Sequence, residues 1–206
     1  MIKRYNRGDR LTFLGRNPLR QQTQNLVDSS VDPERSSYYL TEFQAKHPDI
    51  FSQLDKQGER FSWLITVFAS SRFLSEELLQ HPDWLLTISN LEGPLSLADY
   101  NERLSAFLKE REIASPTALD LALFRRKELV RLVIRDVLCR STLSEVTQEL
   151  SNLADAILER ALLKVNLDVA ARHGAPQTED AFGVSVPAAF TVLALGKLGG
   201  RELNYS

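Results

Sequence analysis

Apolar residues recur at spacings of three and four over most of this sequence, which is the pattern of helices that bury one face. The clearest helix begins at Thr142, where Thr142-Leu-Ser-Glu145 fits a capping box. The apolar positions that follow it are Leu143, Val146, Leu150, Leu153, Ile157, Ala161, Val165 and Val169. This spacing predicts one long amphipathic helix that ends near His173-Gly174, with the stripe from Val146 to Ile157 buried.

Helix start and stop signals predict shorter helices upstream. Asp32-Pro33 is expected to begin a helix that ends at Lys46, because the residue before a proline disfavours helical backbone. Residues 63–79 continue the helical period, and we expect Ser70-Ser71 to divide them into two helices. His81-Pro82 is expected to end the second. The aromatic residues at helical spacing are expected in the core: Trp63, Phe68, Phe73 and Trp84.

Two further helices are predicted between this region and the long helix. Ser96 with Asp99 resembles a capping box and is expected to begin a helix that runs to about Arg111. Ser115-Pro116 is expected to begin the next one, with the serine as the cap and the proline in the first turn. At the start of the chain, residues 1–31 are mostly polar, so they are interpreted as an extended leader with one short strand near Leu11–Leu14.

The character of the sequence changes after Gly174. Residues 175–186 are expected to form a loop, and residues 190–195 form an uninterrupted apolar run that predicts a fully buried strand. Gly196-Lys-Leu-Gly199-Gly200 is expected to be a turn. A buried strand needs neighbours for its backbone groups, and almost no other strand pattern is present. We therefore expect a mostly α protein in which a helical bundle precedes the first strand of a truncated α/β fold, with segments 1–31, 32–140 and 141–206.

Composition and charge exclude several classes of function. The chain has 206 residues, 43% of them hydrophobic, which is enough to bury a core. Its 25 Lys and Arg against 27 Asp and Glu give a net charge of -2, so nucleic acid is not expected as a partner. The first residues are polar, and no apolar run reaches the roughly 18 residues of a membrane span. The sequence indicates a cytoplasmic protein with no membrane partner.

Few residues suggest metal or thiol chemistry. Cys139 is the only cysteine and is expected to be a small buried hydrophobe, and the histidines are far apart in sequence. No metal site is therefore expected within the chain. A run of basic residues is expected to form a solvated helix face in which Asp136 and Glu128 neutralise part of the charge: Arg125, Arg126, Lys127, Arg131, Arg135 and Arg140.

The last residues carry the most specific motif, Phe-Thr-Val-Leu-Ala-Leu-Gly-Lys-Leu-Gly-Gly-Arg-Glu-Leu-Asn-Tyr-Ser from Phe190 to Ser206. This string resembles the opening of the nucleotidyltransferase fold in the glutamate–ammonia-ligase adenylyltransferase family. Upstream, Ser70-Ser-Arg-Phe-Leu and Phe124-Arg-Arg-Lys-Glu-Leu are similar to the family's helical lead-in. The resemblance extends over roughly residues 59–206. The string is neither a Walker A loop nor a dinucleotide-binding G-x-G-x-x-G motif.

The resemblance implies a bifunctional enzyme whose first module removes AMP from a tyrosine of glutamine synthetase by phosphorolysis, with release of ADP. Its second module adds AMP from ATP, and a PII-type signalling protein is a further implied partner. The form Arg-Glu-Leu-Asn-Tyr-Ser resembles the first module, in which a second strand bearing an Asp-x-Asp pair follows the Gly-Gly turn and binds Mg²⁺.

The site residues implied by this resemblance are those of the turn, because a backbone without Cβ atoms can approach a phosphate closely. They are Gly199, Gly200, Arg201 and Ser206, with Lys197 left open. The Mg²⁺-binding carboxylates are expected beyond Ser206, so no catalytic residue and no metal ligand is assigned here, and the chain alone is expected to be inactive. Two alternatives stay open: a helical protein-interaction domain without catalysis, and a different nucleotidyltransferase.

Overall fold

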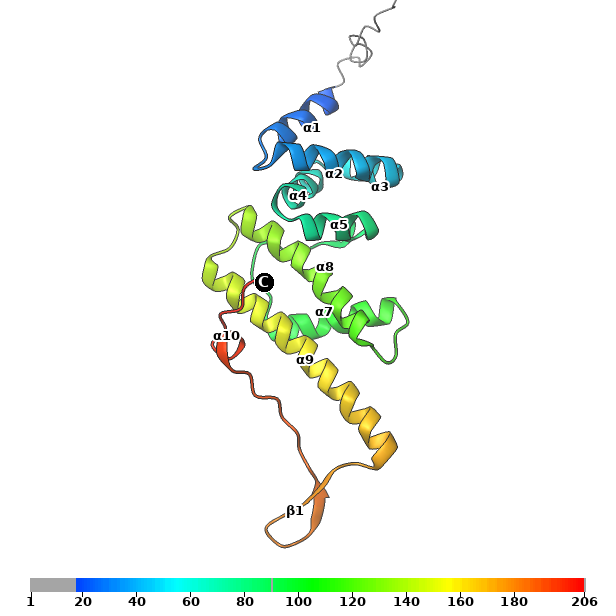
Figure 1. Cartoon of the computed structure of the whole chain (residues 1–206), viewed down its shortest axis with the longest axis vertical. Helices are drawn as coiled ribbons and strands as arrows, with labels where there is room; N and C mark the ends of the chain where they lie inside the picture. Colours follow the sequence, from blue (N-terminus) through cyan, green and yellow to red (C-terminus); the bar gives the residue numbers. More distant parts are fainter. Residues whose placement is uncertain (1–17, 90, 206) are drawn as a thin grey trace, which may run out of the picture. The chain divides into compact units, whose positions relative to one another are not determined.

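The computed structural model describes residues 18–89 and 91–205, which form two compact units divided between Thr87 and Ile88. The described helices of the first unit are α1 (Pro18–Asp28), α2 (Pro33–Lys46), α3 (Pro48–Asp55), α4 (Gly58–Ser70), α5 (Arg72–Gln80) and α6 (Trp84–Thr87) (Figure 1). Helix α4 contributes most to the core, since α1, α2, α3, α5 and α6 all pack against it. Its residues Leu64, Val67 and Phe68 are fully buried.

The predicted boundaries of α2, the break between α4 and α5, and the end of α5 are confirmed, whereas α4 begins at Gly58, before the predicted stretch 63–79. The Asp32 side chain accepts a hydrogen bond from the Arg35 amide at 3.0 Å and so caps α2, which ends at Lys46. Ser71 is extended and separates α4 from α5, and its hydroxyl accepts from the Leu74 amide. His81 ends α5 and stacks on Trp84, with ring centroids 4.5 Å apart.

Two expectations for the first unit are wrong, and one of its helices was not predicted. The second half of the expected leader is helix α1, which packs against α2 and α4 and buries Val27. Helix α3 is an additional element: His47 ends α2 and precedes Pro48, which occupies the first turn of α3, so one proline serves both boundaries. Phe73 is 48% exposed rather than in the core, whereas Trp63, Phe68 and Trp84 are buried as predicted. The expected strand near Leu11–Leu14 lies outside the described residues.

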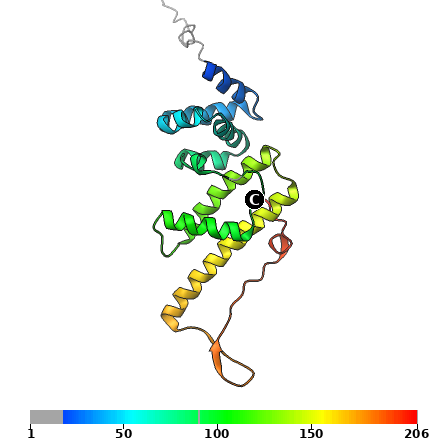
Figure 2. The ribbon, with the colours of Figure 1, turned by 180° about the vertical axis from the view of Figure 1, so that it is seen from behind.

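The second unit contains α7 (Leu97–Glu110), α8 (Ala118–Val137), α9 (Leu143–His173), β1 (Gln177–Glu179), β2 (Ser185–Pro187) and α10 (Gly196–Gly199) (Figures 1 and 2). Helices α7, α8 and α9 pack on one another. Each begins with a capping box: Ser96 with Asp99, Thr117 with Asp120, and Thr142 with Glu145. The expected start of α8 at Ser115 is therefore wrong by two residues, because Thr117 has the acidic partner at the right spacing.

Only the first half of α9 is buried. Val146, Leu150 and Leu153 are 5% exposed or less, as the spacing predicted. Ile157, the fourth residue of the predicted buried stripe, is only partly buried. Farther along, Val165 and Val169 are 54% and 47% exposed although they continue the same apolar pattern. No described helix is both long and apolar enough to cross a membrane.

Residues 175–195 differ from the expectation. The expected loop contains an antiparallel hairpin in which Thr178 pairs with Val186, and the Asp180 carboxylate accepts from the amides of Phe182 and Val184. The expected buried strand at residues 190–195 is not a strand, and Leu195 is 87% exposed. Among the described residues β1 and β2 pair only with each other, so the apolar run has no strand beside it to accept and donate hydrogen bonds. The chain instead runs back alongside α9 (Figures 1 and 2).

Three helices of the second unit end in the same way. Glu112 after α7, Cys139 after α8 and Arg201 after α10 have φ of 56°, 55° and 56°. At each end the residue in the left-handed conformation donates its amide to the carbonyl three residues back, and the next amide reaches the carbonyl five residues back. This is the Schellman motif, in which glycine usually occupies the left-handed position. Cys139 is consequently exposed, which corrects the expectation of a buried thiol.

Replacing Glu112 with glycine is expected to raise the free energy of unfolding by about 0.5–1 kcal/mol, because glycine adopts positive φ without the Cβ clash. The side chain lost is exposed. The control is Glu102→Gly, the same change at an exposed position inside α7, which is expected to destabilise by about 1 kcal/mol. Urea denaturation followed by far-UV circular dichroism measures both, and destabilisation by Glu112→Gly would contradict the assigned backbone conformation.

Candidate functional site

Gly199 ends a single helical turn, α10, and Gly200 follows it; both glycines are constrained by the chain itself. A Cβ at Gly199 would lie 2.5 Å from the Ala194 carbonyl oxygen, which is closer than a side chain allows. At Gly200 the nearest atom to such a Cβ, the Gly196 carbonyl oxygen, is 3.4 Å away. Glycine at position 199 is therefore required by a close approach of the backbone to itself. Phosphate contact by the two glycines stays a prediction from the resemblance.

Arg201 lies against α9 in the second unit. Its Nη1 donates to the Asn152 Oδ1 at 2.8 Å, and its Nη2 lies 3.3 Å from the Asp155 carboxylate. Asn152 is itself fixed, since its Nδ2 donates to the Leu95 carbonyl at 2.9 Å. Both terminal nitrogens of the guanidinium thus point to α9, whereas the sequence expectation assigned Arg201 to phosphate.

Tyr205 provides a second connection between the end of the chain and the helices. Its hydroxyl donates to the Asp136 carboxylate on α8 at 3.1 Å. Burial and the neighbouring negative charge of Asp136 raise the pKa of the Tyr205 phenol, so the hydroxyl stays protonated and able to donate. Ser206, the last predicted site residue, lies outside the described residues.

A cavity of about 240 Å³ lies between this terminal segment and the helices. Most of its wall is aliphatic, and the terminal segment closes one side of it. Its lining residues are Arg125, Leu150, Leu153, Ala154, Ile157, Leu158, Leu203 and Asn204. Such a wall fits an apolar group far better than a phosphate.

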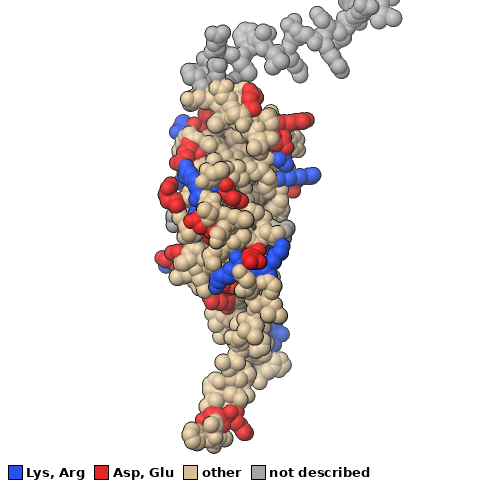
Figure 3. Space-filling view, turned by 90° about the vertical axis from the view of Figure 1, so that its left-hand side faces the viewer, with Lys and Arg blue, Asp and Glu red and all other residues tan. Residues whose placement is uncertain are grey.

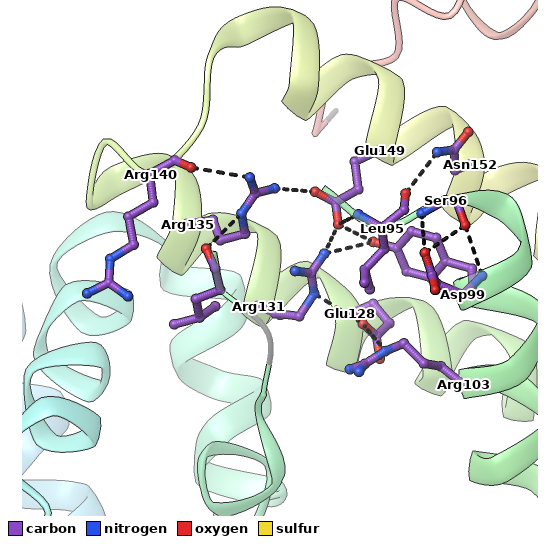
Figure 4. Close-up of polar contacts among 12 residues, drawn as sticks. Leu95, Ser96, Asp99, Arg103, Glu128, Arg131, Arg135, Arg140, Glu149 and Asn152 are labelled. Atoms are coloured by element: carbon purple, nitrogen blue, oxygen red, sulfur yellow. Dashed lines mark hydrogen bonds and ion pairs between the residues drawn. The ribbon is translucent and has the colours of Figure 1, made fainter. Parts of the chain in front are cut away.

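A buried ion network joins the three long helices near this cavity (Figure 4). Glu149 on α9 is fully buried and pairs with Arg131 and Arg135 on α8. The Glu149 carboxylate also accepts from the Leu95 amide at 2.9 Å and from the Tyr100 hydroxyl at 3.2 Å. The carboxylate thus has four donors, which compensates for the loss of water around it.

The network extends to a second buried carboxylate. Glu128 is 2% exposed and accepts from Arg103 on α7 at 2.9 and 3.1 Å, and Arg131 lies 3.5 Å from it. Arg135 reaches the backbone as well, donating to the carbonyls of Leu91 and Arg140 (Figure 4). Burial lowers the pKa of the Arg131 guanidinium, while the neighbouring Glu128 and Tyr100 act in the opposite direction.

The basic cluster on α8 is thus divided between two environments. Arg125 is exposed as expected, but Arg131 and Arg135 are at most 1% exposed, so the expectation of one solvated face is wrong for them. A signal was present in the sequence, because both arginines interrupt the apolar run 129–134 or follow it directly. A cation within such a run needs a buried carboxylate, and Glu149 occupies an equivalent place in the apolar stripe of α9. The charged groups of the network pair with one another and so hold the three helices together.

Charged side chains on the surface show no preference for one sign on the face drawn in Figure 3, where basic and acidic groups are interspersed. Metal ligands do not gather either: among residues 18–89 and 91–205, no three His, Cys, Asp or Glu side chains lie together as a metal site requires.

Comparison with known proteins identifies the family of this chain. The family model described as glutamate-ammonia ligase adenylyltransferase matches residues 61–206. A bifunctional glutamine synthetase adenylyltransferase/adenylyl-removing enzyme of Shewanella woodyi is 30% identical over 86% of this chain and 18% of its own length. Proteins with the same name from Thioalkalivibrio sulfidiphilus and Shewanella loihica are 34% and 32% identical over 69% and 77% of the chain.

The chain belongs to the glutamate-ammonia ligase adenylyltransferase family. It spans less than a fifth of the length of these relatives: the matched region covers 18%, 15% and 16% of the three proteins named. No solved structure matches it.

Proposed function

We propose that this chain forms the helical lead-in and the Gly-Gly turn of the first, adenylyl-removing module of an enzyme that regulates glutamine synthetase. The observation that supports this most directly is the family match over residues 61–206, which includes the whole Gly196–Ser206 string. The relatives named above carry both adenylyltransferase and adenylyl-removing activities in their names. We assign the removing half because Arg-Glu-Leu-Asn-Tyr-Ser resembles the first module of the family.

The proposed reaction is phosphorolysis in the cytoplasm. An oxygen of inorganic phosphate attacks the phosphorus of AMP bound to a tyrosine of glutamine synthetase. The bond from that phosphorus to the tyrosine oxygen breaks, ADP is released, and the phenol takes up a proton. A bound Mg²⁺ would neutralise the charge that develops on the phosphate oxygens. This chain's contribution is positional: Gly199 permits the close turn, and α8 and α9 hold it in place. A PII-type signalling protein is the proposed regulatory partner.

We further propose that the 206 residues alone are inactive. After Gly200 the sequence contains one acidic residue, Glu202, and no aspartate, so the expected Asp-x-Asp pair is absent from it. Phosphoryl transfer depends almost entirely on positioning and charge neutralisation, both of which require those carboxylates. The purified chain, incubated with adenylylated glutamine synthetase, phosphate and Mg²⁺, should release no ADP. Mg²⁺-dependent ADP release by the pure chain would contradict this.

A chimera tests the assignment to the removing half. Residues 61–206 would replace the matching segment of the Shewanella woodyi enzyme, and both activities would be measured. Introducing Gly199→Ala should then reduce AMP removal at least roughly tenfold, because its Cβ clashes with the Ala194 carbonyl, and leave AMP addition from ATP unchanged. Gly93→Ala is the matched control, since nothing lies within 4 Å of its added Cβ. Loss of addition with removal intact would show that the segment belongs to the other half.

A further inference from the structure

The backbone at Arg201 raises the question of why an arginine stands there. Arg201 occupies the left-handed position of a Schellman motif, with its amide 3.1 Å from the Leu198 carbonyl and the Glu202 amide 2.7 Å from that of Lys197. Glycine is the usual residue at this position because it has no Cβ to clash. Here two glycines precede the position, and the position itself holds a long cationic side chain. Glu112 and Cys139 occupy the equivalent positions after α7 and α8, so a role for Arg201 has to come from its side-chain contacts.

The contacts of the side chain show what it provides. Asn152 and Asp155 lie three residues apart on α9, so both face the same side of the helix and receive the two ends of one guanidinium. Asn152 is 9% exposed and held by Leu95 and Gln148, so it is a fixed acceptor rather than a mobile surface group. A planar guanidinium bound at two points by a rigid helix has one orientation.

We propose that Arg201 is a positioning residue, which fixes the Gly199-Gly200 turn on α9 through Asn152 and Asp155 and does not itself bind nucleotide phosphate. Tyr205 supplies the second fixed point four residues later, on Asp136 of α8. The turn is thereby held against both helices without a strand beside it. The contribution to catalysis rests on the function proposed above, whereas the docking itself does not.

A charge-exchange experiment tests the docking in the 206-residue chain. Arg201→Asp introduces a residue type that tolerates positive φ, but it puts a second carboxylate on the side of Asp155. Asp155→Arg likewise leaves two cations together, and the double variant restores an opposite pair. We expect each single variant to increase the amide exchange rates of Gly200 and Glu202 about tenfold, and the double variant to return them to within about threefold of the wild type. Both sites are partly exposed, so circular dichroism should show unchanged helix content.

The control compares two single variants, Arg201→Gly and Glu112→Gly. Each replaces a residue of positive φ by glycine, but only Arg201→Gly also removes a side chain that is paired with α9. Both should keep or raise the melting temperature, but only Arg201→Gly should speed the exchange of the Gly200 and Glu202 amides, which donate to the carbonyls of Gly196 and Lys197. If Arg201 had only a general structural role, Arg201→Gly would lower the melting temperature and the protection from exchange together. Unchanged protection in Arg201→Asp, or no recovery in the double variant, would overturn the docking role.

The same variants in the chimera described above separate positioning from phosphate binding. If Arg201 positions the turn, Arg201→Asp lowers AMP removal and the added Asp155→Arg restores it. If it binds phosphate, the double variant stays as inactive as the single one and the KM for phosphate rises, which would overturn the proposal. Recovered amide exchange without any effect of either variant on AMP removal would uphold the docking and count against the proposed function instead.

Discussion

Replacing Glu149 with glutamine is expected to destabilise the chain by about 3–5 kcal/mol, the effect of removing one partner from a buried ion network. Glu149 is fully buried and accepts from Arg131, Arg135, Tyr100 and the Leu95 amide. The amide of glutamine has the same shape, but it carries no charge to balance two guanidiniums that water does not reach. Urea denaturation followed by far-UV circular dichroism gives the free energy of unfolding.

The matched control lies on the same helix. Asp168 on α9 pairs with Lys164 at the surface, where Asp168 is 49% exposed, so Asp168→Asn should change the free energy of unfolding by less than about 1 kcal/mol. A change of that small size for Glu149→Gln would show that the carboxylate is not needed to balance the arginines. The network would then contribute little, and the packing of α8 against α9 would depend on apolar contacts alone.

Local signals in the sequence were sufficient to place the boundaries of α2, α7 and α9 and the break between α4 and α5. Ser96 with Asp99 and Thr142 with Glu145 identify their own helices, because a capping box is complete within four residues. Ser71 was predicted to separate two helices for the same reason, since its hydroxyl satisfies an amide three residues away. Such signals need no knowledge of distant contacts.

Features that depend on distant residues were missed. Helix α1 has few apolar residues and is stabilised by α2 and α4, so its own pattern does not distinguish it from a polar leader. Arg131 and Arg135 were expected in solvent because their partner, Glu149, is on another helix. The start of α8 was misplaced for a local reason: Ser115-Pro116 is also a good start signal, and the capping box of Thr117 with Asp120 was overlooked.

For the candidate site, the sequence identified the family but not the contacts of the site residues. The string ending in Gly199-Gly200 led to the family, and the family match confirms it. The sequence could not show that Arg201 faces α9, because Asn152 and Asp155 precede it by more than forty residues. The apolar run 190–195 was predicted to be a buried strand, which is wrong: it pairs with no strand among the described residues, and its residues are mostly exposed.

Leu153→Ala tests the buried face of α9 and is expected to destabilise by about 2–5 kcal/mol, as large-to-small changes in a core do. Leu153 is 2% exposed and lines the cavity of about 240 Å³ beneath the terminal segment. Truncation therefore enlarges a space that already exists, and the rigid Leu95–Asn152 and Arg201–Asp155 contacts around it oppose collapse.

The control for this prediction is Leu158→Ala, which lies on the same helix and lines the same cavity but is 40% exposed. Its loss should cost about 1 kcal/mol or less, because much of the side chain already contacts water. Thermal melts of the two variants compare them directly. Equal effects would mean that the buried face of α9 is not the one that Val146, Leu150 and Leu153 define. A larger effect at Leu153 places the core of the second unit beneath the segment that carries the glycines, so the stability of the helices and the position of the turn depend on the same face of α9.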